Sequence, residues 1–232
     1  MSDQVTPTPE ALSPSVGLAV LHLFCKADAL YDAEAFVAAV KHAEAAGCQV
    51  ATIAVLGHKA DMAIMAMHAD QRELRALQTA VQRAGLEVVD SYVSLTEASE
   101  YAKGLPEHMV NARLYPNLPT DLSLPAWCFY PMSKKREGDA NWFTLPYDER
   151  KELMSEHGQS GRKFAGRVVQ YVTGSAGLDD YEWGVTLFAQ RPDDLKEVVY
   201  TMRFDTASAV YAEFGPFYTG VVTPVEVLAP TL

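Results

Sequence analysis

The segment 130–158 contains one histidine, His157, which ends a predicted helix and is the first candidate for chemistry. Helical spacing puts it three and four residues after Met154 and Leu153, on an apolar face. A histidine there either packs against the core at a helix C-terminus, where the macrodipole favours it, or binds a metal as a neutral imidazole. No HxxH, HExxH or Cys/His cluster accompanies it, which disfavours a zinc site made of protein ligands alone. One histidine suffices where a macrocycle supplies the other donors, as in haem.

Two more polar side chains stand out in predicted strands. Gln170 lies in RVVQYVT, on the face shared by Val168 and Val172, because strand side chains alternate. Its amide is either hydrogen-bonded in the core or lines a pocket. Tyr130 shares a strand face with Cys128, just before a proline and a basic loop. It is either a packing residue or a redox tyrosine, and the redox role requires an oxidant such as a haem-type iron nearby.

The basic loop holds Lys134, Lys135 and Arg136 in a chain whose formal net charge is −11. Such a run is either a solvated loop or a rim that binds carboxylates, for which arginine offers bidentate pairing and lysine a point charge. The acidic balance elsewhere argues against a nucleic-acid partner, because phosphate binding needs a basic surface.

Composition indicates a folded chain in a reducing compartment. The 232 residues are 49% hydrophobic, which suffices for one large domain or two small ones. Cys25, Cys48 and Cys128 all sit in apolar surroundings, so we expect buried free thiols and a cytoplasmic location. No apolar run approaches the length of a membrane span, and residues 1–15 read as a flexible polar tail without a signal peptide.

Two rounds of strands and helices would position these side chains. Pro146 stands in the first turn of the helix that carries His157, and Gly158 is expected just past its end. Residues 103–125 hold four prolines and read as a connection. Strands are predicted at 16–26, 48–57, 86–97, 125–132, 167–175, 182–190 and 215–226, and helices at 31–47, 69–85, 146–157 and 191–215.

An internal echo indicates duplication. Residues 52–85 and 184–215 both run from a strand through a loop into a long helix that ends at a glycine. The pattern predicts an α+β fold of two similar units, each with its sheet on one side and its helices on the other.

The C-terminal half, from about Arg113 to Gly220, closely resembles the chlorite dismutase superfamily, and within it the haem-forming branch of coproheme decarboxylases. The N-terminal half fits less sharply, through GHKADMAIMAMH and the order of its elements. The matching runs are RLYP, FYPMSKKREGDANWFTLP, ERKELMSEHGQSGRKFAGRVVQYVTGS, GLDDYEWGVTLFA and VVYTMRFDTASAVYAEFGPFYTG.

The resemblance implies two ferredoxin-like domains of the dimeric α/β-barrel type, at 16–112 and 113–232, with the tetrapyrrole in the second. It implies a homopentamer, and a transient contact with coproporphyrin ferrochelatase. The implied reaction is oxidative decarboxylation of iron coproporphyrin III (coproheme) by hydrogen peroxide at two propionates, giving haem b through a monovinyl intermediate as the last step of coproporphyrin-dependent haem biosynthesis.

The resemblance also assigns residues. His157 matches the axial iron ligand, Tyr130 the catalytic tyrosine proposed to abstract hydrogen from a propionate, and Lys134 a lysine near the reactive propionates. The remaining matches are propionate contacts at Arg113, Tyr115, Arg203 and Ser208, pocket-lining residues at Met132 and Trp142, and a proximal-side aromatic residue at Trp183.

Gln170 separates the branches of the superfamily. Chlorite dismutases carry an arginine thirteen residues after the axial histidine, where this chain has Gln170, so decarboxylation is expected and little chlorite breakdown. Some relatives use a distal histidine as base. In this chain Tyr115 occupies the stretch where that distal histidine would be expected, and His108 is the only histidine near this stretch in sequence. The identity of the distal base therefore stays open. The alternatives are a haem carrier without turnover, a chlorite dismutase-like peroxidase, and a haem-free enzyme of the same fold.

Overall fold

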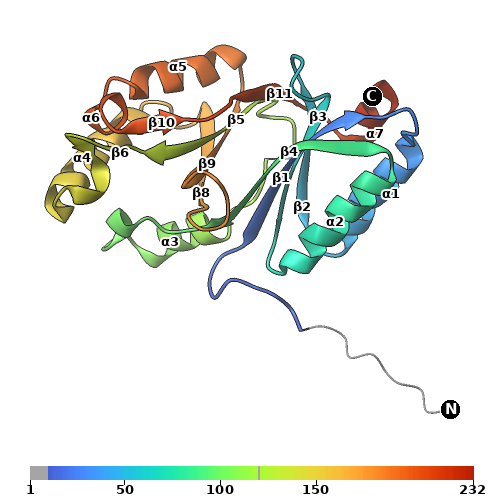
Figure 1. Cartoon of the computed structure of the whole chain (residues 1–232), viewed down its shortest axis with the longest axis horizontal. Helices are drawn as coiled ribbons and strands as arrows, with labels where there is room; N and C mark the ends of the chain where they lie inside the picture. Colours follow the sequence, from blue (N-terminus) through green and yellow to red (C-terminus); the bar gives the residue numbers. More distant parts are fainter. Residues whose placement is uncertain (1–9, 120) are drawn as a thin grey trace.

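The computed structural model describes residues 10–119 and 121–232, so most of the expected tail, residues 1–9, lies outside the described part. The N-terminal half has the order βαββαβ. Its elements are β1 (Ala19–Ala27), α1 (Ala33–Ala45), β2 (Gln49–Val55), β3 (Met62–His68), α2 (Gln71–Arg83) and β4 (Leu86–Thr96) (Figure 1).

A short helix, α3 (Glu107–Leu114), lies in the connection between the halves. The C-terminal half repeats the order with small additions. Its main elements are β5 (Ala126–Lys134), α4 (Tyr147–Arg162), β8 (Val168–Gly174), β9 (Trp183–Ala189), α5 (Pro192–Met202) and β11 (Tyr218–Val222). The additions are β6 (Arg136–Glu137), β7 (Ala140–Asn141), α6 (Thr206–Ala209), β10 (Ala212–Phe214) and α7 (Val225–Leu228).

The strands form one closed sheet. Nine strands of the described chain follow the order β10-β5-β11-β2-β3-β1-β4-β8-β9, and β5 also pairs with β9. Each half therefore contributes four antiparallel strands in the ferredoxin-like order, β4-β1-β3-β2 and β8-β9-β5-β11. The halves meet at two seams, where Leu95 of β4 pairs with Gly174 of β8 and Val55 of β2 pairs with Gly220 of β11. The α+β prediction is confirmed, and the domain boundary at 112 stays a prediction.

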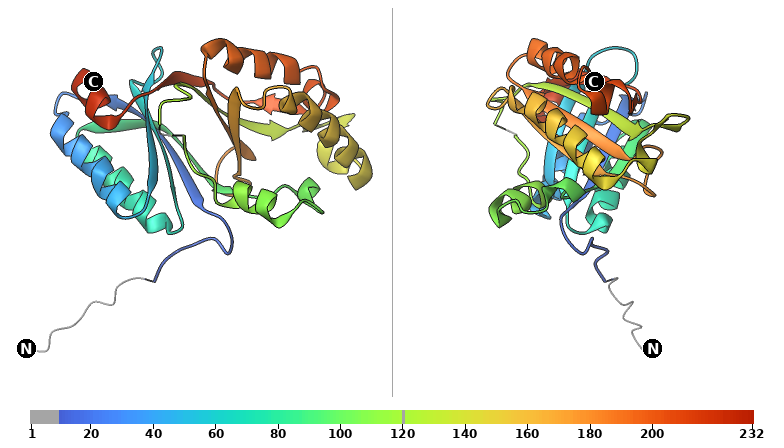
Figure 2. Two further views of the ribbon diagram at one scale, coloured as in Figure 1. Left: turned by 180° about the vertical axis from the view of Figure 1, so that it is seen from behind. Right: turned by 90° about the vertical axis from the view of Figure 1, so that its left-hand side faces the viewer.

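Alternation along the strands separates an interior core from outer layers. In β5, Trp127 and Phe129 point into the barrel, whereas Cys128 and Tyr130 point outward toward α5. Helices α1 and α2 cover the outer face of the N-terminal half, as Figures 1 and 2 show from three sides. All three cysteines are buried free thiols, as predicted.

One strand was missed, and two predicted helices were wrong in extent. Strand β3 was missed because MAIMAMH is rich in Ala and Met, which do not favour strands, yet its residues 62–67 are fully buried. Helix α4 runs through Gly158 to Arg162, because Gly158 does not adopt the left-handed conformation that ends a helix. The long helix expected at 191–215 stops at Met202, and Asp205 caps a separate turn, α6, before β10.

Candidate functional site

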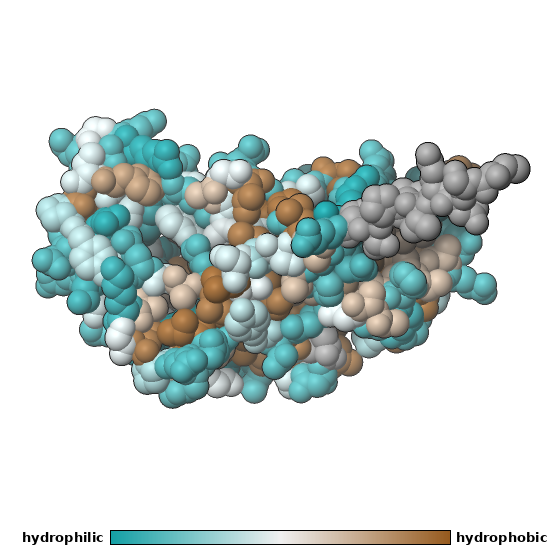
Figure 3. All heavy atoms as spheres, turned by 90° about the horizontal axis from the view of Figure 1, so that it is seen from below, coloured by the Kyte–Doolittle hydropathy of each residue, from teal (hydrophilic) through white to brown (hydrophobic). Residues whose placement is uncertain are grey.

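Helix α4 stands apart from the sheet that it would be expected to cover. None of its sixteen residues is buried, and it packs against α5 and α6. On β8, Gln170 is exposed and Val172 is 45% exposed although both lie in mid-strand. Apolar side chains gather in a hollow on this half of the molecule (Figure 3). An exposed apolar strand face, together with a helix that buries none of its residues, is the kind of surface on which a large ligand can bind.

His157 of α4 forms a hydrogen-bonded pair with a buried carboxylate. Its Nδ1 lies 2.9 Å from Oδ2 of Asp205, and the hydroxyl oxygen of Ser208 lies 3.3 Å from the same nitrogen. Asp205 is 3% exposed and also caps α6 by accepting from the Ser208 backbone N–H at 2.9 Å. With Nδ1–H donated to a carboxylate, Nε2 is the nitrogen whose electron pair is free for a metal.

Burial lowers the pKa of His157, and the neighbouring Asp205 carboxylate opposes that shift. The imidazole is therefore neutral at neutral pH, which is the form that binds a metal. No cluster of three or more His, Cys, Asp or Glu side chains lies in position to hold a metal within the described ranges. A single neutral imidazole with a carboxylate behind it fits an iron porphyrin, which supplies the other four ligands itself.

Tyr130 lies on β5, and its side chain points to the outer face of the sheet, toward α5. Its ring stacks on Phe217, with 4.5 Å between centroids, and meets Phe214 edge-on at 5.6 Å. Burial raises the pKa of its hydroxyl well above the usual range, so the group stays a neutral phenol at any physiological pH. The Met132 side chain, two residues on, packs against the same cluster.

Lys134 is on the same strand face but turns toward α6. Its Nζ donates to the carbonyl of Ala207 at 2.6 Å and lies 4.6 Å from the centre of the buried Trp142 ring. Burial lowers the pKa of Lys134 to about 8, although Asp205 and Glu182 oppose the shift. The Lys134 charge acts on both Asp205 and His157, and the expected contact of this amine with a propionate stays a prediction.

Trp183 begins β9 directly beside Met132 of β5. Its indole N–H donates to Oε1 of Glu97 at 3.1 Å, a residue that follows β4 in the N-terminal half. A side chain on Gly174 would collide with that Glu97 carboxylate. Glu97 thus fixes the indole across the seam between the halves.

The expected propionate contacts lie on three different elements. Arg113 and Tyr115 are exposed at the end of α3, and His108 is exposed nearer its start. The guanidinium of Arg203 lies 4.1 Å from the Tyr200 ring centre, at the surface beyond α5. Ser208, by contrast, contacts His157 directly.

Sequence reasoning did not single out Asp205 or Glu97. Asp205 had a signal in the run DTAS, because an aspartate three residues before a serine often caps a helical turn. Glu97 had none, because its contact with Trp183 joins residues 86 positions apart.

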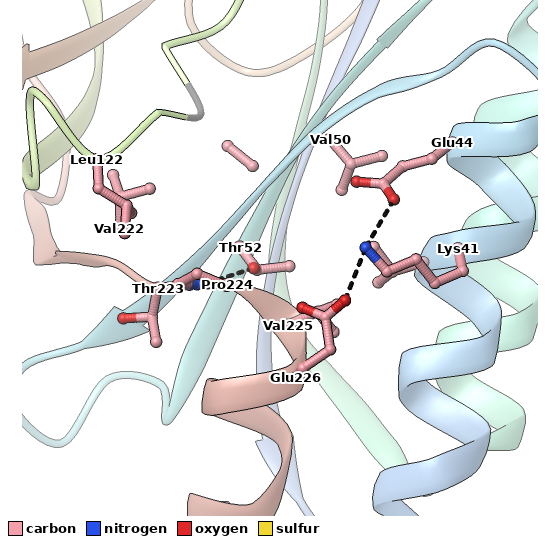
Figure 4. A pocket seen from close by; sticks show the side chains of 12 residues that line it. Lys41, Glu44, Val50, Thr52, Leu122, Val222, Thr223, Pro224, Val225 and Glu226 are labelled. Carbon is pink, nitrogen blue, oxygen red and sulfur yellow. Dashed lines mark hydrogen bonds and ion pairs between the residues drawn. The ribbon is translucent and has the colours of Figure 1, made fainter.

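A cavity of about 240 Å³ lies elsewhere, between α1, β2 and the segment that leads from β11 into α7. Figure 4 shows Lys41 there between two carboxylates, 3.1 Å from Glu44 and 2.8 Å from Glu226. None of the candidate site residues lines this cavity.

No helix in the described ranges has both the length and the apolar character to cross a membrane.

Comparison with known proteins places the fold. The coproheme decarboxylase of Staphylococcus carnosus is 44% identical over 186 residues, which are 75% of this chain and 73% of that protein. A Natronomonas pharaonis protein named for haem binding is 45% identical over 188 residues, 73% of this chain; the match spans only 30% of that longer protein.

Solved structures agree. A haem-binding protein from Thermus thermophilus superposes with a TM-score of 0.83 at 34% identity, covering 96% of this chain and 99% of that one. A chlorite dismutase mutant from Candidatus Nitrospira defluvii superposes with a TM-score of 0.74 at 20% identity, covering 94% and 96%, and shares the fold. Residues 26–223 match the chlorite dismutase family. The chain belongs to the chlorite dismutase family.

Proposed function

We propose that this protein is a coproheme decarboxylase. It uses hydrogen peroxide to decarboxylate iron coproporphyrin III at two propionates, giving haem b through a monovinyl intermediate, the last step of coproporphyrin-dependent haem biosynthesis. The carrying observation is that the C-terminal half holds both a neutral, Asp205-paired His157 on α4 and the buried phenol of Tyr130 on the outer face of its sheet. The likeness to the Staphylococcus carnosus enzyme supports the reaction.

His157 would hold the iron through Nε2, with Asp205 keeping the proton on Nδ1. The bound iron porphyrin supplies the oxidising power that it draws from peroxide. Each propionate side chain loses one hydrogen atom and one further electron, which leaves a vinyl group and releases carbon dioxide. Each decarboxylation therefore removes two electrons and one proton and consumes one peroxide, which takes up a second proton and is reduced to two waters.

Tyr130 would relay this oxidation. Because its hydroxyl keeps its proton, the phenol can give up a proton and an electron together and then take a hydrogen atom from the propionate side chain. Phe217 and Phe214 exclude water from its ring and hold its orientation.

The substrate carries four carboxylates, so cations are expected around it. Arg113 and Arg203 are exposed and free to pair with carboxylates at the rim, and Tyr115 offers a hydroxyl. Lys134 and Ser208 would act closer to the axial ligand. Met132, Trp142, Gln170 and Trp183 would line the pocket.

We also propose that the protein acts in the cytoplasm as a homopentamer and receives its substrate from coproporphyrin ferrochelatase in a transient contact. Its three buried thiols fit a reducing compartment. Sedimentation of the purified protein tests the assembly directly, and a monomeric species at micromolar concentration would contradict it.

The reaction is tested by titrating the coproheme-loaded protein with peroxide and weighing the pigment by mass spectrometry. We expect two successive losses of one carboxyl group and one hydrogen each, with the one-loss species as an intermediate. A pigment that is bound but unchanged would instead make the protein a haem carrier. Bleaching without mass loss would make it a peroxidase, and chlorite breakdown would place it with the chlorite dismutases despite Gln170.

A further inference from the structure

The segment that follows α3 is held much more firmly than α3 itself. No residue of α3 is buried. Four residues later, Leu118 is 7% exposed and belongs to the interior core of the barrel. The chain therefore changes within a few residues from an exposed helix that carries Arg113 to a segment whose Leu118 packs into the barrel core.

Gln49, the first residue of β2, hydrogen-bonds to the backbone of this segment through both its amide nitrogen and its amide oxygen. Its Nε2 donates to the carbonyl of Pro116 at 2.9 Å, and its Oε1 accepts from the backbone N–H of Leu118 at 2.8 Å. The two partners fix the orientation of the amide, because only one assignment of its oxygen and nitrogen satisfies both. An amide side chain that pairs with a backbone donor and acceptor in this way substitutes for a strand partner.

Other contacts hold the same stretch at neighbouring points. The hydroxyl of Tyr171 on β8 donates to the carbonyl of Asn117 at 2.6 Å, and the hydroxyl oxygen of Tyr115 accepts from the backbone N–H of Gly17 at 3.1 Å. Tyr171 follows Gln170, whose side chain lies on the uncovered face of β8. The gripped segment thus ties the N-terminal half to the strand that borders the proposed substrate site.

We propose that Gln49 is a positioning residue for substrate binding: from the N-terminal half, it sets the place of Arg113 and Tyr115 by clamping the backbone of residues 116–118. This inference rests on the proposed function, since it takes Arg113 and Tyr115 to meet substrate carboxylates. His157 and Tyr130 are held by other contacts, on α4 and β5. Loss of the clamp should therefore weaken binding and leave the chemical step intact.

The test variant is Gln49→Leu, which keeps the size of the side chain and removes both hydrogen bonds. Tyr171→Phe removes a third bond to the same segment and serves as an independent second variant. The matched control is Thr52→Val, also on β2, which removes the Thr52 hydroxyl bond to the carbonyl of Thr223 at 2.6 Å, near β11 and away from α3.

Two readouts on the full chain concern the substrate, and a third concerns the segment itself. Soret titration with coproheme should show a dissociation constant raised roughly threefold to tenfold in Gln49→Leu, as expected for one or two lost hydrogen bonds. The peroxide-driven rate of the fully loaded protein should stay within about twofold of wild type. Amide hydrogen exchange of the ligand-free protein should speed up across residues 107–118 in Gln49→Leu and Tyr171→Phe only.

Unchanged exchange at 107–118 in Gln49→Leu overturns the clamp, whatever the protein binds. Faster exchange together with unchanged coproheme affinity overturns its role in substrate binding. An equal loss of affinity in Thr52→Val also overturns it, because the effect would then be general to contacts between the halves. Failure of wild type to bind coproheme would instead refute the proposed function, and the exchange experiment would still decide whether Gln49 clamps the segment.

Discussion

The imidazole of His157 and the carboxylate of Asp205 lie 2.9 Å apart although 48 residues separate them in the chain. Asp205 has two duties, because one oxygen accepts from His157 and the other caps α6. The hydrogen bond from the Ser208 backbone thereby fixes the orientation of the Asp205 carboxylate behind the imidazole. A carboxylate in this position makes the histidine a stronger electron donor to a metal.

Asp205→Asn tests that arrangement. Asparagine is also a good helix cap, so α6 should survive, while the negative charge behind His157 is lost. We expect coproheme to bind with a weaker iron–histidine bond and a more positive reduction potential, because the imidazole becomes less basic. Redox titration and resonance Raman spectroscopy of the loaded variant measure both. Ser208→Ala, which removes the longer 3.3 Å contact, is the control and should change the potential less. Equal potentials in wild type and Asp205→Asn would contradict the role of the carboxylate.

Tyr130→Phe should bind coproheme like wild type and fail to decarboxylate it. The ring and its stacking on Phe217 are retained, so only the hydroxyl is lost. Mass spectrometry of the pigment after peroxide addition measures the outcome, with a rate at least about a hundredfold lower as the expectation. The matched control is Tyr211→Phe, another buried tyrosine, which packs on Trp142 and should retain activity. Near-normal turnover in Tyr130→Phe would rule out the relay.

Lys134 should make folding stability rise with pH. Its pKa falls from an ordinary value of 10.5 to about 8 on folding, so between these values the unfolded chain binds more protons than the folded one. The free energy of unfolding should therefore increase by up to about 3 kcal/mol from pH 8 to 10.5 through this residue. Below pH 8 the Lys134 amine is protonated in both states, and the folded state carries the full cost of burying its charge.

Lys134→Met removes the titrating group and keeps the packing against Trp142. Urea unfolding of the ligand-free protein at about pH 7.5, 9 and 10 measures the difference between variant and wild type. We expect the variant to be relatively most stable at the lowest pH and to lose that advantage as pH rises. A difference that does not change with pH would show that Lys134 titrates normally.

Gly220→Ala should loosen the seam between the halves. Gly220 of β11 pairs with Val55 of β2, and a side chain on it would collide with the Ala54 carbonyl and lie 2.5 Å from the Ile53 side chain. We expect a loss of about 1–3 kcal/mol in the free energy of unfolding, as for other overpacked sites. Gly161→Ala is the control.

In Gly161→Ala the added carbon would lie 3.7 Å from the Met202 side chain, an ordinary contact between α4 and α5. Alanine should stabilise α4 by roughly 0.5–1 kcal/mol. Urea unfolding of both variants separates the two effects, and a stable Gly220→Ala protein would mean that the strands can move apart at no cost.

The sequence was a good guide where periodicity and caps act locally. The alternation around Tyr130 correctly put Cys128 on the same outer face, and the helix start at Pro146 agrees with α4. Gln170 could be read two ways from sequence, and its exposure favours the pocket over the core. The resemblance to the chlorite dismutase family is confirmed by the match over residues 26–223.

Contacts between residues far apart in the chain could not be predicted from the sequence, because they form only in the tertiary fold. Whether Gly158 ends a helix depends on its backbone conformation, and in this fold that conformation is not left-handed. The grip of Gln49 on Leu118 joins residues 69 positions apart, and no local pattern marks it. The same holds for the pairing of His157 with Asp205, because neither residue type nor spacing identifies a partner that only the tertiary fold brings near.

The place of β11 in the closed sheet has a consequence for biosynthesis. This strand, Tyr218–Val222, lies between β5 and β2 and is the last strand of the described residues. Until it leaves the ribosome, β2 has one open edge that can pair with other chains. During synthesis this edge of the N-terminal half therefore stays unpaired until residues 218–222 have been made. Nascent chains stalled just before residue 218 should be the form most dependent on chaperones.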